Sequence, residues 1–340
     1  MPHWIKPLIP ALALSLLSAP VLAAEEVNLY SARKEALIKP LLDNFTKQTG
    51  IKVNLVTGKA KTLLKRLQSE GRNTPADMLL TTDAGNLHAA TTAHLLQPVD
   101  SSILKATVPQ NLRDPKDHWY ALSTRSRVIV HSKERVKASD LSTYEDLADP
   151  KWKGRICIRS SNNIYNQSLL ASLISHNGAK QAESWAKGVV ANMAQPPKGN
   201  DRAQVKAVAV GVCDIAVINT YYMGVMLHKD ADQKKAASKV SVFFPNQSDR
   251  GAHINISGAG IIKGAKHKEN AIKLLEFLVS DEAQRWYAQA NHEYPVKPGI
   301  PVSDIVNAWG YPFKQDGLNV GELGKYNTDA VKVFDRAGWK

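Results

Sequence analysis

The chain has 340 residues, of which 44% are hydrophobic and 22% charged, with a formal net charge of +13 at pH 7. This length exceeds what a single hydrophobic core usually serves, so we expect two domains. The basic residues are dispersed in short runs mixed with acids, such as residues 229–235. Such runs are typical of solvated helix ends and exclude a concentrated nucleic-acid-binding stripe.

The N-terminus indicates where the protein works. Residues 1–24 contain one lysine, then an apolar stretch, then small residues before Ala23 and Ala24. This order predicts a secretory signal peptide, and the apolar stretch is too short and too interrupted by proline to predict a membrane span. The mature protein is therefore expected to be exported, which also argues against a nucleic-acid partner.

The first third alternates strands and helices. Strands are predicted at 27–30, 51–56 and 76–82, and amphipathic helices at 35–50 and 61–71. The last strand, ADMLLTT, is a continuous apolar run suited to a parallel strand that is buried on both faces. This β-α-β-α-β order predicts an open parallel sheet with right-handed crossovers.

A second α/β region follows, and long extended segments flank it. Strands are predicted at 154–160 and 213–219, and helices at 164–178, 180–193 and 201–211. The extended segments are 119–132 and 239–264, with further helices at 269–289. We interpret the extended segments as two crossings between lobes, so the chain leaves the first lobe, builds the second and returns.

The two cysteines, Cys157 and Cys213, lie in the second region. In an oxidising compartment an even count favours one disulfide, although two separate buried thiols are the alternative. If the cysteines are bonded, their two strands are neighbours or nearly so. Tyr165 lies eight residues after the first cysteine and Tyr221 eight after the second, so both tyrosines would then reach one rim.

The candidate site is at the ends of strands, because ligands of open α/β sheets bind beyond the carboxyl ends of the strands. Residues in such positions are Arg33 after the first strand, Tyr165 at the start of a helix, and the pair Tyr221 and Tyr222 after the strand CDIAVIN. Arg125 lies in the first crossing segment.

Three phenols and two guanidiniums restrict the ligand. A phenol has a reference pKa near 10 and stays neutral at pH 7 unless a cation stabilises its anion. Zinc prefers cysteine and histidine, and calcium prefers carboxylates and carbonyls, whereas ferric iron accepts tyrosine, as in the haem of catalase. The arginines then fit a carbonate-like oxyanion that completes the coordination.

Each residue alone also has an ordinary structural explanation. A tyrosine pair is more often packing than ligand, and either arginine could form an ion pair or stabilise a strand. His253 and His292 are possible metal donors, but isolated histidines are usually structural. Only the combination of residues at strand ends in an exported two-lobed chain favours metal binding.

Several segments resemble the periplasmic ferric-ion-binding proteins of bacterial iron ABC importers, and the resemblance covers essentially the whole mature chain. It rests on NLYSAR (28–33), LADPKWKGR (147–155), NNIYNQS (162–168), CDIAVINTYY (213–222) and SGAG (257–260).

The resemblance implies a two-lobed periplasmic binding protein fold of type II, with a mixed, mostly parallel sheet flanked by helices in each lobe. Its two crossing strands would join lobe 1, residues 25–123 and 247–300, to lobe 2, residues 124–246 and 301–340. It implies a periplasmic, monomeric carrier that binds Fe³⁺ with carbonate or a similar synergistic anion and delivers it to an inner-membrane ABC permease.

The resemblance also implies roles for single residues. Tyr165, Tyr221 and Tyr222 match the family's metal ligands, and Arg33 and Arg125 match its anion-binding arginines, although Arg127 competes with Arg125.

One departure concerns ligands from lobe 1. Many relatives have a histidine or a His-Tyr pair where this chain has Lys34 and Glu35, and the glutamate that other members use aligns only loosely, near Thr82 and Asp83. The sequence therefore predicts three tyrosine ligands from lobe 2 and an anion in the remaining positions.

Two other functions are compatible with parts of this pattern. One is a binding protein of the same fold for a metal-free solute, such as an oxyanion, a phosphonate, thiamine or a polyamine. The other is an exported enzyme, but no G-x-S-x-G or H-E-x-x-H motif is present, and both cysteines are assigned to the disulfide. We therefore expect that the chain is not an enzyme.

Overall fold

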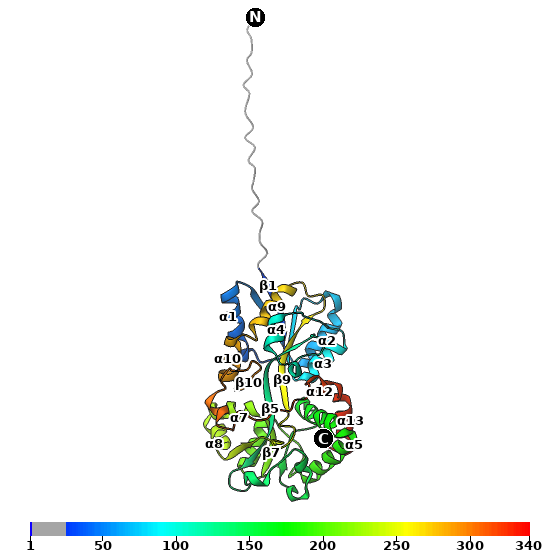
Figure 1. Cartoon of the computed structure of the whole chain (residues 1–340), viewed down its shortest axis with the longest axis vertical. Coiled ribbons are helices and arrows are strands. Elements are labelled where there is room, and N and C mark those ends of the chain that lie inside the picture. Colours follow the sequence, from blue (N-terminus) through cyan, green and yellow to red (C-terminus); the bar gives the residue numbers. More distant parts are fainter. Residues whose placement is uncertain (2–24) are drawn as a thin grey trace.

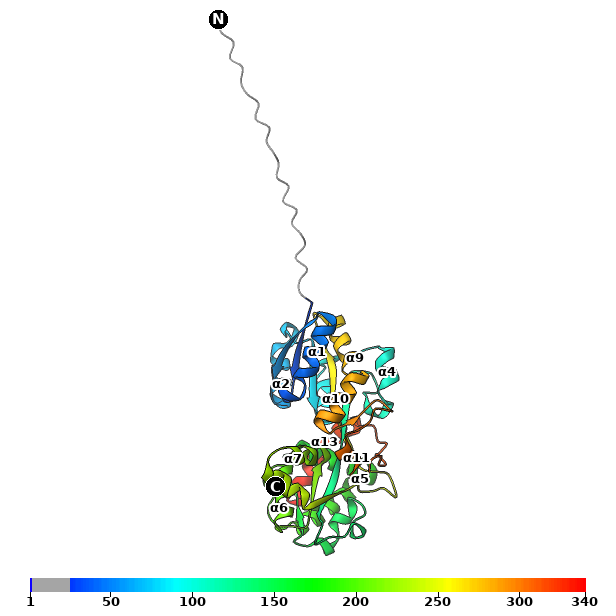
Figure 2. The same cartoon turned by 90° about the vertical axis from the view of Figure 1, so that its left-hand side faces the viewer.

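The computed structural model describes Met1 and residues 25–340, so the predicted signal peptide lies outside the described residues. In the described part, no helix is both long enough and apolar enough to cross a bilayer. The molecule consists of two halves stacked along its long axis and joined by long strands (Figures 1 and 2).

The first half begins with alternating strands and helices, as the sequence predicts. The elements are β1 (Glu26–Ser31), α1 (Lys39–Thr49), β2 (Lys52–Thr57), α2 (Ala60–Glu70), β3 (Met78–Thr82), α3 (Ala84–Thr92), β4 (Leu96–Gln97) and α4 (Ser102–Thr107). The chain then enters the first long strand, β5 (Tyr120–Ser132).

The second half is built from β6 (Ile156–Cys157), α5 (Ile164–Asn192), α6 (Asp201–Ala209), β7 (Ile215–Asn219), α7 (Thr220–His228), α8 (Ala231–Ser238) and β8 (Val240–Phe243). The second long strand, β9 (Ile254–Ile262), leads back to the first half, where α9 (Lys268–Phe277) and α10 (Asp281–Asn291) follow. The remaining elements are β10 (Tyr294–Pro295), α11 (Asp304–Asn307), α12 (Gly321–Lys325) and α13 (Asn327–Ala337).

One mixed sheet runs through both halves in the order β2-β1-β3-β9-β5-β7-β6. β1 pairs in parallel with β2 and β3, and β6 pairs in parallel with β7. Both long strands are antiparallel to each of their neighbours: β5 pairs with β7, β8, β9 and β10, and β9 with β3, β4 and β5. The expected mixed α/β sheet with two crossing strands is confirmed.

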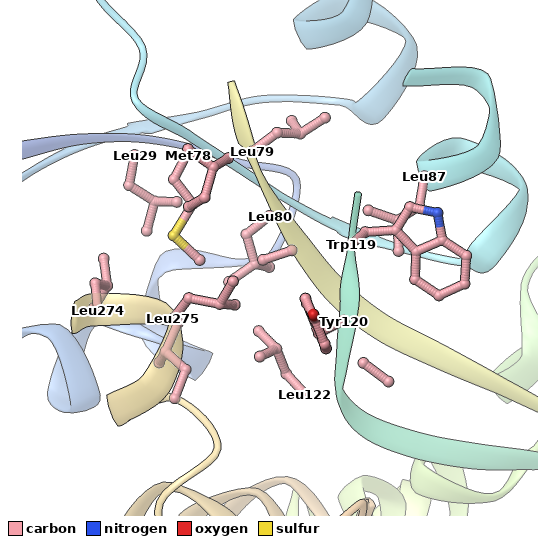
Figure 3. Packing of buried hydrophobic residues seen from close by; sticks show 14 of the residues in the cluster. Leu29, Met78, Leu79, Leu80, Leu87, Trp119, Tyr120, Leu122, Leu274 and Leu275 are labelled. Carbon is pink, nitrogen blue, oxygen red and sulfur yellow. The ribbon is translucent and has the colours of Figure 1, made fainter. Parts of the chain in front are cut away.

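The core of the first half packs around β1, β3 and β9. Met78, Leu79 and Leu80 of β3 are buried on both faces of the strand, which explains its continuous apolar run. Figure 3 shows these residues between Leu274 and Leu275 of α9 on one side and the start of β5 on the other. Burying a leucine side chain of this kind stabilises the fold by about 1.5–3 kcal/mol.

The second half has two smaller cores. One lies between α5, α13 and the strands β5 and β7, and the other surrounds the disulfide between Cys157 and Cys213. The bonded pair is confirmed, and it joins β6 to Cys213, two residues before β7.

The structure also corrects several expected boundaries. The strand expected at 154–160 forms only as Ile156–Cys157, and the extended segment 239–264 divides into β8 and β9. The helix expected from residue 35 begins as an α-helix only at Lys39, after a 3-10 turn, with Pro40 in its first turn where proline is tolerated. Gly178, with a φ of 80°, interrupts α5 between the two helices predicted there.

Candidate metal and anion site

The three candidate tyrosines occupy the first turns of two helices. Tyr165 is the second residue of α5, where the Asn163 side chain caps the helix by accepting from the Tyr165 backbone N–H at 3.2 Å. Tyr221 and Tyr222 are the second and third residues of α7, directly after β7. Because β6 and β7 are parallel and neighbouring, the chain leaves both strands at the same edge of the sheet.

The structure brings the three phenols together. The hydroxyl oxygens of Tyr165 and Tyr221 are 3.4 Å apart, and the ring centroids of Tyr221 and Tyr222 are 4.2 Å apart. All three side chains are half-buried. Because the three tyrosines are in the first turns of α5 and α7, the positive ends of both helix dipoles lie near the phenol oxygens. This position favours negative charge on the phenol oxygens.

In the free protein two of these phenols hold their protons firmly. Burial, and next the neighbouring Tyr165, raise the pKa of Tyr222 to about 12. Burial raises the pKa of Tyr221 well above its ordinary value, with added repulsion from the other two phenols, while Arg125 acts in the opposite direction. A cation that binds these oxygens as phenolates must displace their protons.

Arg33 lies in a buried polar network beneath the strand ends. Its Nη1 donates to the Ser257 hydroxyl at 2.8 Å, and its Nη2 forms an ion pair with Glu293 Oε2 at 2.6 Å. Burial alone would lower the pKa of Arg33, but the Glu293 carboxylate raises it. The guanidinium carbon also lies 5.3 Å from the centre of the Tyr287 ring.

Arg125 connects this network to the tyrosines. Its Nη1 donates to the same Ser257 oxygen at 3.1 Å, and its guanidinium carbon lies 5.7 Å from the centre of the Tyr165 ring. Its competitor, Arg127, instead forms a buried ion pair with Asp201 and donates to Asn166 and Asn219. Of the two, Arg125 is therefore the arginine near the phenol cluster.

Sequence reasoning missed three residues here. Glu293 and Ser257 hold Arg33. The guanidinium carbon of Arg159 lies 6.0 Å from the centre of the Tyr165 ring, and Arg159 also forms an ion pair with Asp201. Arg159 follows β6 closely, so the strand-end argument could have found it. Ser257 belongs to the SGAG segment and Glu293 directly precedes β10, but nothing in the local sequence links either residue to Arg33, which lies 224 and 260 positions away.

The possible ligands from the first half have other partners or face solvent. Asp83 is fully buried and its two carboxylate oxygens accept from Ser168, Asn255 and the Gly85 backbone. Burial raises its pKa. Lys34 and Glu35 are exposed.

The two histidines also have structural surroundings. Burial, followed by repulsion from nearby arginines, lowers the pKa of His253 to about 3, so its imidazole is neutral. His292 stacks on His228 with ring centroids 4.9 Å apart, and its Nδ1 contacts the Ser303 hydroxyl. Among the described residues, no three histidine, cysteine or carboxylate side chains are grouped so that they could hold a metal ion. The phenol cluster is therefore the candidate metal centre.

Comparison with known proteins finds one family of solute-binding proteins and relatives whose names refer to iron. A family model for bacterial extracellular solute-binding proteins matches residues 73–310. Iron uptake protein A1 of Synechocystis is 50% identical over 317 residues, which cover 93% of this chain and 88% of the relative. The major ferric iron-binding protein of Neisseria meningitidis is 30% identical over 293 residues, or 85% of this chain and 86% of the relative.

A solved structure agrees closely with the fold. The Trichodesmium protein IdiA or FutA, in complex with iron and citrate, superposes with a TM-score of 0.90 at 52% identity, covering 93% of this chain and all of that one.

Proposed function

Since this chain is a member of the bacterial extracellular solute-binding protein family, in its ferric-iron-binding branch, we propose that it binds Fe³⁺ through Tyr165, Tyr221 and Tyr222. Its relatives are binding proteins for iron uptake, and the chain is not an enzyme. Iron is the cargo in this proposal and is carried rather than transformed.

The observation that carries the proposal is the 3.4 Å separation of the Tyr165 and Tyr221 hydroxyl oxygens, with the Tyr222 ring 4.2 Å from that of Tyr221. Oxygens this close can bind one small ion together. Three phenolates would balance the charge of Fe³⁺, and phenolate is the hard, anionic donor that this ion prefers. Among the described residues no histidine or carboxylate cluster offers an alternative centre.

The remaining coordination positions are assigned to carbonate or a similar oxyanion. Support comes from the two buried guanidiniums of Arg33 and Arg125, which meet at Ser257 next to the phenol cluster. Arginine binds carboxylate-like oxyanions through paired N–H donors. Asp83 is held by other partners, and Lys34 and Glu35 are exposed, so the proposal gives the remaining iron coordination positions to the anion.

The proposal extends to transport. The mature chain would work as a monomer in the periplasm after removal of residues 1–24, and would pass iron to an inner-membrane ABC permease. Residues 25–123 with 247–300 would form one lobe and residues 124–246 with 301–340 the other. Closure of the two lobes around β5 and β9 would enclose the ion.

A visible absorption spectrum of the purified protein tests this function. Iron bound by phenolates absorbs visible light by charge transfer, so the protein should be coloured as isolated or after addition of a ferric chelate. The colour should disappear after treatment with citrate at low pH. A protein that stays colourless with ferric iron, yet binds an oxyanion, phosphonate, thiamine or polyamine, would instead be a carrier of a metal-free solute.

A further inference from the structure

One carboxylate in the second half connects the two helices that carry the tyrosines. Asp201, the first residue of α6, is completely buried. Its Oδ1 accepts from the backbone N–H of Asn219 at 3.2 Å, and Asn219 is the residue directly before α7. The same oxygen accepts from Arg127 Nη1 at 3.1 Å, and Oδ2 accepts from Arg159 Nη1. Asp201 is therefore bonded to three separate segments of the chain.

Arg127 extends this connection to the start of α5. Its Nη2 donates to the side-chain oxygen of Asn166, which is the residue next to Tyr165. Asn166 Nδ2 in turn donates to the backbone carbonyl oxygen of Arg159 at 2.8 Å. The guanidinium carbon of Arg159 lies 6.0 Å from the centre of the Tyr165 ring. The first turn of α5, like the start of α7, is consequently attached to Asp201 through hydrogen bonds.

The side chain of Asn219 takes part in this network instead of capping α7. An asparagine directly before a helix usually accepts from an N–H of the first turn, but in the described part of the chain the Asn219 side chain makes no such bond. Its Oδ1 accepts from Arg127 Nη1 at 3.2 Å. Asn166 and Asn219 thus accept from the same guanidinium, which is almost completely buried and is neutralised by Asp201.

The charge of Asp201 acts against iron binding. After burial and the neighbouring phenols, this carboxylate also raises the pKa of Tyr221 and of Tyr222, so it makes loss of their protons harder. A phenolate site would bind a cation more readily without this negative charge behind it. A favourable contribution of Asp201 to the site therefore has to come from the hydrogen bonds that hold the two helix starts.

We infer that Asp201 is a positioning residue for the three tyrosines, whose separation it fixes by holding the starts of α5 and α7 in place before a metal ion arrives. The inference deepens the proposed function and rests on it for the identity of the ion. Asp201 does not contact the ion and acts through the side chains that lie between it and the two helices. The positions of the phenols belong to the iron-free protein and can be measured without iron.

The first experiment measures the ferric affinity of Asp201→Asn by competition with a chelator. The new Oδ1 can keep the bond from Asn219, but an amide nitrogen replaces the oxygen that accepts from Arg159, and the negative charge is lost. Affinity should fall by about 10–100-fold, the loss that removal of an outer-shell partner of a metal site usually causes. If only the charge of Asp201 mattered, the variant would bind iron at least as tightly as the wild type, and that result would overturn the inference.

Asp77→Asn is the matched control. Asp77 is also completely buried and also joins distant segments, because it accepts from Asn28 and from His267 in the first half. Its replacement should lower the stability of the protein but leave the ferric affinity of the folded chain within about twofold of the wild type, as expected for a distant, independent site. A comparable loss of affinity in both variants would show that Asp201 affects iron binding only through general stability, and the inference would fail.

A double variant separates position from stability. In Asp201→Asn the buried charge of Arg127 loses its partner, which destabilises the fold. Arg127→Met combined with Asp201→Asn removes both charges and should recover much of the lost unfolding free energy. The bond to Asn166 is still missing, so the ferric affinity should stay about tenfold or more below that of the wild type. Recovery of both stability and affinity would mean that Asp201 has only a structural role.

An iron-free measurement distinguishes a failure of this inference from a failure of the proposed function. In wild-type protein with ¹³C-labelled tyrosine rings, the signals that disappear in Tyr165→Phe, Tyr221→Phe and Tyr222→Phe should each be single and sharp. In Asp201→Asn they should broaden or split, because the rings occupy several positions, whereas in Asp77→Asn they should not.

The outcomes of the ring measurement are independent of iron. Unchanged signals in Asp201→Asn would overturn the inference, whether or not the protein binds iron. A wild-type protein that binds no ferric iron, but whose ring signals broaden in Asp201→Asn alone, would refute the proposed function and support the positioning role.

Discussion

The hydroxyl oxygens of Tyr165 and Tyr221 lie 3.4 Å apart, although 56 positions separate the two residues in the sequence. This distance is too long for a strong hydrogen bond between hydroxyls, which is normally 2.5–3.0 Å. It therefore suits two oxygens that approach a common ion better than two that satisfy each other. The pairing of β6 with β7 and the disulfide beside it maintain this distance.

Removal of a single phenol oxygen should strongly weaken iron binding. Tyr165→Phe, Tyr221→Phe and Tyr222→Phe each delete one proposed ligand, and each should reduce ferric affinity by at least about 100-fold, more than loss of an outer-shell contact usually costs. Competition with a chelator, followed by the visible charge-transfer band, measures the change. Tyr326→Phe, at the residue that precedes α13, is the matched control and should keep the wild-type affinity and colour.

Iron affinity should fall as the pH falls. Burial raises the pKa of Tyr222 to about 12 and that of Tyr221 well above its ordinary value, so both phenols are protonated at neutral pH and iron must release their protons. Lower pH favours the protonated, iron-free form, and affinity should drop by more than about tenfold per pH unit because more than one proton is displaced. An acid titration of the coloured protein measures this slope. A flat profile would mean that the phenols do not bind iron as phenolates.

Loss of the disulfide should destabilise the second half. Cys157 and Cys213 are 56 positions apart, and on the chain-entropy model their bond stabilises the fold by about 4 kcal/mol. The double variant Cys157→Ser/Cys213→Ser should show a lower midpoint in denaturant than the oxidised protein. Addition of a reductant should lower the wild-type midpoint in the same way and leave the variant unchanged. Equal midpoints in all cases would show that strand pairing alone holds this region.

Gly224 should be sensitive to even a small side chain. A Cβ at this position would lie 2.5 Å from the His292 ring, so Gly224→Ala must displace either the histidine or α7, which carries Tyr221 and Tyr222. We expect a loss of about 1–3 kcal/mol in unfolding free energy and weaker iron binding.

A matched control and a rescue variant make this prediction specific. Gly317→Ala, where no atom lies within 4 Å of the new Cβ, should be tolerated. Combining Gly224→Ala with His292→Gly should recover part of the lost iron affinity, because it removes both the ring and the Cβ of His292, which would lie 2.5 and 2.7 Å from the new Cβ. No recovery would mean that the histidine is not the obstacle.

The positions of the tyrosines were predictable because they depend on local rules. A buried strand followed by a helix places the first helical residues at the edge of a sheet, and both β6–α5 and β7–α7 follow this pattern. The cysteine pair added the information that these two strands are neighbours. Together these observations predict that Tyr165 lies beside Tyr221.

The choice between Arg125 and Arg127 could not be made from the pattern. Both residues lie on the same face of β5, because they are two positions apart in a strand. Only the register separates them: Arg125 is opposite Asn255 of β9, and Arg127 is opposite Asn219 of β7. Strand pairing between residues so far apart in the chain cannot be predicted from the local sequence. The contact between Arg33 and Glu293 could not be predicted for the same reason.

The three phenols stem from α5 and α7, whose strands and disulfide belong to the same half of the molecule. The full set of proposed protein ligands is consequently assembled before the other half approaches. Capture of the ion can then precede the hinge motion, and an open molecule would already carry colour. The closing step would serve to shield the cargo from water and competing chelators and to signal that the carrier is loaded.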